Sequence, residues 1–168
     1  MISRVRLAAL CALGLAAQAC GGGGGSRDAA AAAQALLAAA QAGDAAHFEA
    51  AIDRPALRAE LRQQMIAVAH ANGLDVGGPS DQALDRMIGP QSIHLVQAAG
   101  GAPLAGPPSP AQVAALIKPA DRGRVCLHDL TPQQACILTF LRESAGWRLV
   151  SMPSGEVVVA IPAAPAKK

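Results

Sequence analysis

Apolar residues recur every three or four positions through much of the chain, which is the spacing of an amphipathic α-helix. The pattern predicts a first helix over residues 28–42, a segment of high helix propensity that is almost entirely alanine with a thin leucine stripe. Gly43 suits the position after a helix end, and Asp44 can cap a second, short helix. A third helix is expected between Asp53 and Asn72, with a proline in its first turn.

Two further helical regions follow in the middle of the chain. Ser80 can cap a helix that Gly89 and Pro90 interrupt, and the apolar face then continues through residues 93–96 as a second short helix or as part of a kinked one. The glycine- and proline-rich stretch 100–108 is expected to be a loop. Residues 109–112 then form a capping box that starts a last helix ending at Pro119.

The residue preferences change after Arg124, where three short segments are rich in branched or aromatic residues. Residues 125–130, 135–142 and 147–152 are separated by turn sequences, which predicts an antiparallel meander. Residues 156–161 are a candidate fourth strand. The predicted fold class is therefore α+β, with about five N-terminal helices packed on a C-terminal antiparallel meander of three to four strands.

The N-terminus has the pattern of an export signal. Arg4 and Arg6 precede an apolar run that ends at Ala19 and is too short to span a bilayer as a helix. Residues 1–19 are therefore expected to be a signal peptide. Two processing routes fit: ordinary cleavage at an A-x-A site would release a soluble periplasmic protein, whereas Cys20 stands where a bacterial lipoprotein carries its lipidated, palmitate-bearing cysteine.

The residues after Cys20 favour lipidation. Gly21 to Ser26 form a Gly/Ser run, and a flexible linker of this kind would hold a domain away from a membrane surface. The chain is accordingly divided into a tether at 20–28 and one α+β domain at 29–153, followed by the candidate strand and a tail expected to be disordered at 154–168. The lipid anchor would make the membrane a partner. The protein would be attached to the outer or the inner membrane and would face the periplasm.

Charge and composition argue against nucleic acid as a partner. Loss of Arg4 and Arg6 with the signal would leave equal numbers of basic and acidic residues, and the basic ones are scattered along the chain. Two phenylalanines, one tryptophan and no tyrosine leave few side chains on which bases could stack.

Cys126 and Cys136 lie on consecutive predicted strands. If they stood directly opposite each other, the hairpin would be centred on Thr131, where the turn sequence lies. An exported chain passes through an oxidising compartment, so a structural Cys126–Cys136 disulfide is expected, the alternative being buried free thiols. In this arrangement Cys136 shares a strand face with Leu138 and Phe140.

No pattern in the chain points to catalysis, a metal or a cofactor. The four histidines, His47, His70, His94 and His128, have no metal-ligand spacing, and no serine lies in a nucleophile motif. The protein is therefore expected not to be an enzyme. Basic residues at 54, 58 and 62 form a stripe on the third helix, which is expected to be a solvated face rather than a site for anionic lipid or a carboxylate ligand.

Several sequence motifs resemble domain-of-unknown-function family 2939. They are residues 39–44, 52–61, 84–90 and the closing segment from Phe140 to Val150, so the similarity would cover roughly residues 31–152. The resemblance implies a small exported or membrane-anchored bacterial protein and supplies no activity or catalytic residues. The outline of helices followed by strands is also similar to the cystatin-like cone of nuclear-transport-factor-like proteins, a fold that hosts binding proteins and enzymes alike.

These observations lead to three interpretations. The first is an envelope lipoprotein whose non-catalytic domain is structural or binds an envelope protein partner. The second is a periplasmic protein that binds a small ligand in a cone pocket between helices and sheet. The third is an enzyme. A pocket in which His94 or His128 faces Asp75 or Asp129 would favour this interpretation. The first is preferred.

Overall fold

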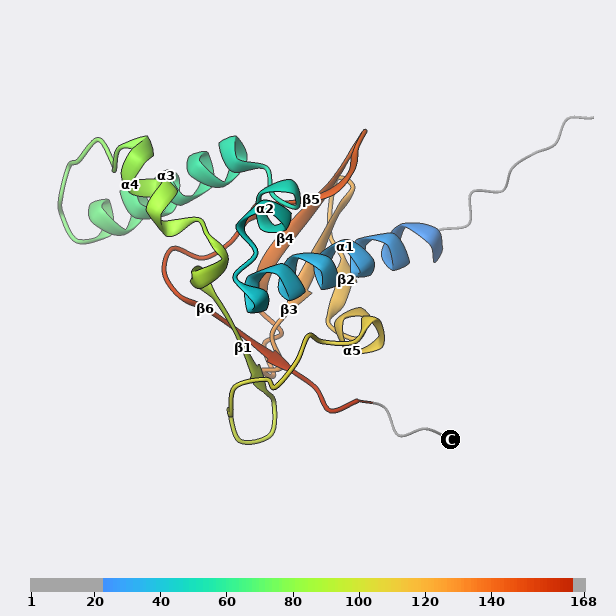
Figure 1. The fold of residues 1–168 in the computed structure, drawn as a ribbon. Helices are drawn as coiled ribbons and strands as arrows, with labels where there is room; N and C mark the ends of the chain where they lie inside the picture. Colours follow the sequence, from blue (N-terminus) through green and yellow to red (C-terminus); the bar gives the residue numbers. More distant parts are fainter. Residues whose placement is uncertain (1–22, 165–168) are drawn as a thin grey trace, which may run out of the picture.

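The structure is a computed structural model that describes residues 23–164 (Figure 1). The predicted signal peptide and Cys20 lie outside the described residues. The elements are α1 (Gly23–Ala42), α2 (Ala45–Ala50), α3 (Arg54–Ala71), α4 (Asp81–Met87), the 3-10 helix η1 (Pro90–Ser92), β1 (Ile93–Gln97), α5 (Pro110–Ala114), β2 (Ile117–Pro119), β3 (Arg124–His128), β4 (Cys136–Glu143), β5 (Gly146–Ser151) and β6 (Val157–Ile161). The fold class is α+β, as predicted.

The main sheet is antiparallel, with strand order β2-β3-β4-β5. Strands β3, β4 and β5 form the predicted meander, and α1 packs across one face of the sheet against all four strands (Figure 1). The centre of the core consists of fully buried side chains from both layers: Leu36, Leu37, Leu127, Leu138, Phe140 and Leu149. Burial of these large apolar groups is the main force that holds α1 on the sheet.

The helix starts follow the sequence signals. The side chains of Asp44, Asp53 and Ser80 accept hydrogen bonds from backbone N–H groups in the first turns of α2, α3 and α4. Ser109 and Gln112 form the predicted capping box at the start of α5. The end of α5 was predicted wrongly, because Ile117–Pro119 leaves the helix and pairs with β3 as the edge strand β2.

Residues 93–97 form a strand, so the prediction of a helix there was wrong. In β1, Ile93 and Leu95 are buried and His94 is exposed, which is the alternation of a strand with one face in the core. Strand β6 pairs with β1 in parallel and does not extend the meander. Val157, Val159 and Ile161 of β6 are buried in the same core, so the domain continues to Ile161 instead of ending at residue 153.

The first helix also begins earlier than expected. Because α1 starts at Gly23, residues 23–28 belong to a helix, and the predicted flexible tether over residues 20–28 is wrong for this part. The described chain thus enters its first helix three residues after Cys20. Among the described residues, no helix is long and apolar enough to cross a bilayer.

Cys126 and Cys136 are joined by a disulfide, with their Cα atoms 5.6 Å apart. The prediction that the two cysteines stand directly opposite each other was wrong. Cys126 pairs with Thr139, and Cys136 pairs with His128. A bulge between these pairs leaves Ile137 without a partner. The prediction that Cys136 shares a strand face with Leu138 and Phe140 was also wrong. Cys136 is exposed, whereas Leu138 and Phe140 are buried.

Candidate functional site

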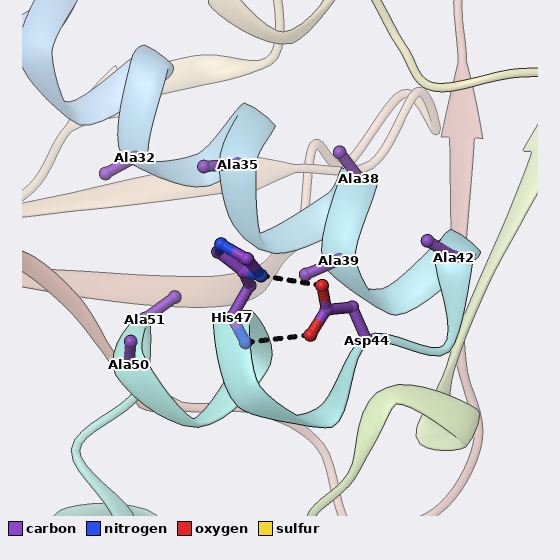
Figure 2. Close-up of a pocket in the computed structure, with 9 residues that line it drawn as sticks. All are labelled: Ala32, Ala35, Ala38, Ala39, Ala42, Asp44, His47, Ala50 and Ala51. Atoms are coloured by element: carbon purple, nitrogen blue, oxygen red, sulfur yellow. Dashed lines mark hydrogen bonds and ion pairs between the residues drawn. The ribbon is translucent and has the colours of Figure 1, made fainter.

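An open groove of about 520 Å³ lies between α1 and α2 (Figure 2). It exists because Gly43, with φ at +67°, ends α1 in the left-handed conformation and lets the chain reverse into α2. The methyl side chains of alanine leave space that larger residues would fill. The groove is lined by Ala32, Ala35, Ala38, Ala39, Ala42, Ala50 and Ala51, together with Asp44 and His47.

The only polar side chains among the described lining residues of this groove are Asp44 and His47. The Asp44 carboxylate accepts a hydrogen bond from the His47 backbone N–H at 3.0 Å and lies 2.6 Å from its Nδ1 (Figure 2). These bonds from His47 lower the pKa of Asp44 below its usual value. The His47 side chain is 82 % exposed, so the pair is solvated and lies at the groove rim.

The polar groups of this groove are available for hydrogen bonding to a partner. Asp44 is already used as the cap of α2, and the described lining contributes no third polar group that could act as a nucleophile or stabilise a developing charge. A water-exposed histidine–carboxylate pair can donate or accept a hydrogen bond from a partner. The alanine walls offer apolar contact along the length of α1.

His94 and His128 do not pair with Asp75 or Asp129, the aspartates expected for an enzyme site. His94 lies 4.0 Å from Glu156, and His70 lies 3.5 Å from Asp75 on the surface. His128 Nδ1 is hydrogen-bonded to a backbone carbonyl. The part of the chain that the structure describes contains no group of three or more potential metal ligands.

His128 and Asp129 do line one small hollow, of about 120 Å³. Asp129 accepts hydrogen bonds from the backbone N–H and the hydroxyl of Thr131, at 3.2 and 2.8 Å. His128 is held by the carbonyl of Gln134. Each side chain therefore serves the turn between β3 and β4, and neither is directed at the other.

The basic stripe on α3 is an intramolecular ion-pair ladder. Arg54 pairs with Glu49 and Asp85, and Arg58 pairs with Asp85. The third member, Arg62, pairs with Asp81. The hydrogen bonds from Arg54 lower the pKa of Glu49 below its usual value. The stripe therefore connects α3 to α2 and α4 and is neither fully solvated nor directed at an external anion.

The groove between α1 and α2 was not predicted from the sequence. Its signal was present, because no charged residue occurs between Asp28 and Asp44, although Ala31, Ala35 and Ala42 of α1 are exposed. An exposed helix face normally carries charged side chains. The two polar residues of α1 after Asp28, Gln34 and Gln41, are hydrogen-bonded to backbone carbonyls of the loop before α5.

Comparison with known proteins identifies the family. Neither the curated proteins nor the solved structures include a match to the chain. A family model, however, matches residues 27–120, which is more than half of the chain and runs from α1 to the end of β2. The strand motifs between Phe140 and Val150 lie beyond the matched part. The chain therefore belongs to the family described as protein of unknown function, DUF2939.

Proposed function

We propose that the protein is an exported envelope lipoprotein, anchored through Cys20, whose folded domain binds a partner protein and does not catalyse a reaction. The N-terminal sequence supports export, with two arginines, an apolar run and a cysteine after small residues. The observation that carries the binding role is the open, alanine-lined groove between α1 and α2.

The position of α1 gives the anchor a structural consequence. Three residues span at most about 10 Å, and α1 begins three residues after Cys20. A lipid on Cys20 would therefore hold the start of α1 close to the bilayer surface. The groove is lined by α1 residues between Ala32 and Ala42, and α2 lies beside the C-terminal end of α1 (Figure 1). The groove would therefore lie away from the anchor point and remain accessible.

The shape and chemistry of the groove indicate the kind of partner. Short alanine side chains on α1 and α2 permit close approach of another backbone, and a helix with small apolar residues on one face fits such a surface. Asp44 and His47 at the rim would pair with a polar group beside that face. The partner we propose is thus a helix of another envelope protein.

The anchor is tested by the intact mass of the protein purified from membranes. A diacylglycerol-modified N-terminus at Cys20 is the expected result, and Cys20→Ser should move the protein to the soluble periplasmic fraction. Cys11→Ser is the matched control, because Cys11 lies within the predicted signal peptide. A native protein without lipid would contradict the anchor and favour ordinary signal cleavage.

The groove is tested with a photo-reactive residue at position 35, in the groove, and another at position 67, an exposed alanine of α3 outside it. A specific adduct is expected from position 35 alone. Ala35→Arg should abolish the adduct formed from a probe at Ala38, whereas Ala67→Arg should leave it intact. Equal labelling from both positions would contradict the proposal.

A further inference from the structure

A second cleft, separate from the groove, lies beneath the first part of α3. This helix is attached to β5 at one end of the cleft and to the segment after β5 at the other. At one end the Asp53 N–H donates to the Leu149 carbonyl at 2.9 Å, and the Leu149 N–H donates to the Ala51 carbonyl at 3.0 Å. At the other end the Gln64 amide donates to the Met152 carbonyl at 3.1 Å and accepts from the Ser154 N–H at 2.9 Å.

Between these attachments α3 packs along the edge strand β5, and a cleft of about 420 Å³ lies between the helix and residues of β3, β4 and β5. On the helix side, Ala56 and Ala59 are too small to fill it. On the sheet side, Leu141 and Val150 form an apolar floor. The cleft volume falls in the range of sites that take small organic molecules.

The charges of the cleft lie on opposite walls. Glu60 comes from α3 and Arg124 comes from β3, and neither forms an ion pair with any residue that the structure describes. Asp53, a second carboxylate at the cleft, caps α3 through one of its oxygens. This differs from the opposite side of α3, where the three arginines of the ladder are all paired.

We propose that this cleft binds a small zwitterion of the amino-acid class, a free amino acid or a dipeptide with an apolar side chain. Arg124 binds its carboxylate, since a guanidinium can donate two parallel hydrogen bonds to a carboxylate. Glu60 binds its ammonium group, and the apolar side chain rests on Leu141 and Val150. Thr139 and Ser151 add hydroxyl groups to the wall that contains Arg124.

The proposal does not depend on the partner-binding groove, because the two sites share no lining residue. It is tested by calorimetric titration of the full chain in mild detergent. The probes are L-leucine and L-leucyl-L-leucine, their C-terminal amides, which lack the carboxylate, and their N-acetyl forms, which lack the ammonium group. A free zwitterion should bind at least about tenfold more tightly than either blocked form.

Two variants assign the charges to their walls. Arg124→Gln should make the free acid and its amide bind equally well, and Glu60→Gln should do the same for the free amine and its N-acetyl form. Arg142→Gln is the control, because Arg142 is an exposed strand arginine that does not line the cleft. The unfolding midpoint of each variant verifies that it is folded.

Two results would overturn the proposal. One is the absence of saturable binding of both free zwitterions up to about 10 mM. The other is an Arg124→Gln protein that still discriminates the acid from the amide as the Arg142→Gln protein does. Either result leaves the photo-crosslinking at the groove unaffected, so the two proposals fail separately.

Discussion

Arg58 and Asp85 form a two-point ion pair that joins α3 to α4. Arg58 Nε lies 2.7 Å from one carboxylate oxygen of Asp85, and Nη2 lies 2.5 Å from the other. Arg54 reaches the same carboxylate at 3.1 Å. The hydrogen bonds from Arg58, followed by those from Arg54, lower the pKa of Asp85 below its ordinary value of 3.8.

This pKa shift predicts how stability depends on pH. A carboxyl whose pKa is lower in the folded than in the unfolded protein stabilises the fold at neutral pH, and that contribution is lost as the pH falls through the folded pKa. Asp85→Asn should therefore lower the urea midpoint near pH 7, and its difference from the native protein should shrink as the pH falls below 3.8.

The control for this measurement is Asp121→Asn, since Asp121 is an exposed aspartate without an ion pair among the described residues. Its urea midpoint should follow that of the native protein at both pH values. An Asp85→Asn protein with the native midpoint at neutral pH would show that the pair does not stabilise the α3–α4 contact.

The disulfide between Cys126 and Cys136 closes a loop with a sequence separation of 10 residues. Loss of this cross-link increases the entropy of the unfolded chain, so reduction should lower the free energy of unfolding by about 2–3 kcal/mol. Urea unfolding with and without reductant measures the difference. In the double variant Cys126→Ala and Cys136→Ala, reductant should not change the free energy of unfolding. A change there would show that the effect of reductant does not come from this disulfide.

Strand β6 provides a comparison between two neighbouring valines. Val159 is fully buried and Val158 is 55 % exposed. Val159→Ala should cost about 1.5–3 kcal/mol of unfolding free energy through lost burial, whereas Val158→Ala should change it by less than about 0.5 kcal/mol. Denaturant unfolding of both variants measures the two changes in unfolding free energy. Equal effects would be inconsistent with the β1–β6 pairing and its buried face.

Gln64 connects α3 to the segment after β5. Without its amide, the N–H of Ser154 and the carbonyl of Met152 lose their partner. We therefore expect Gln64→Ala to accelerate hydrogen exchange at the Ser154 amide by about tenfold or more. Amides of the β3–β4 ladder should keep their native exchange rates. Unchanged exchange at Ser154 would show that the Gln64 hydrogen bonds are not maintained in solution.

Most of the local structure could be predicted because its signals are local. Asp44, Asp53 and Ser80 cap helices through backbone groups within three residues, so their roles can be recognised in the sequence. Strands β3, β4 and β5 follow one another in sequence, joined by residues 129–135 and 144–145, and each was recognised from its residue preferences.

The prediction failed where pairing is distant in sequence. Ile93 of β1 pairs with Val157 of β6, and nothing near Ile93 indicates that partner. A five-residue apolar segment fits a short helix or a strand equally well until its neighbours are known. The three arginines of α3 were similarly misjudged, since Asp81 and Asp85, which pair with Arg62 and Arg58, belong to a different helix.

The sequence by itself determined the α+β class, the helix starts, the meander, the choice of Cys126 and Cys136 as partners and the membership of the family. These follow from periodicity, capping, turn residues and motifs, which act over a few positions. Only the tertiary structure decided the β1–β6 pair, the bulge that shifts Cys136 out of register, the ion-pair ladder, and the positions of the groove and the cleft. Each depends on which distant segments share the core, and that is set by burial of apolar surface across the whole chain.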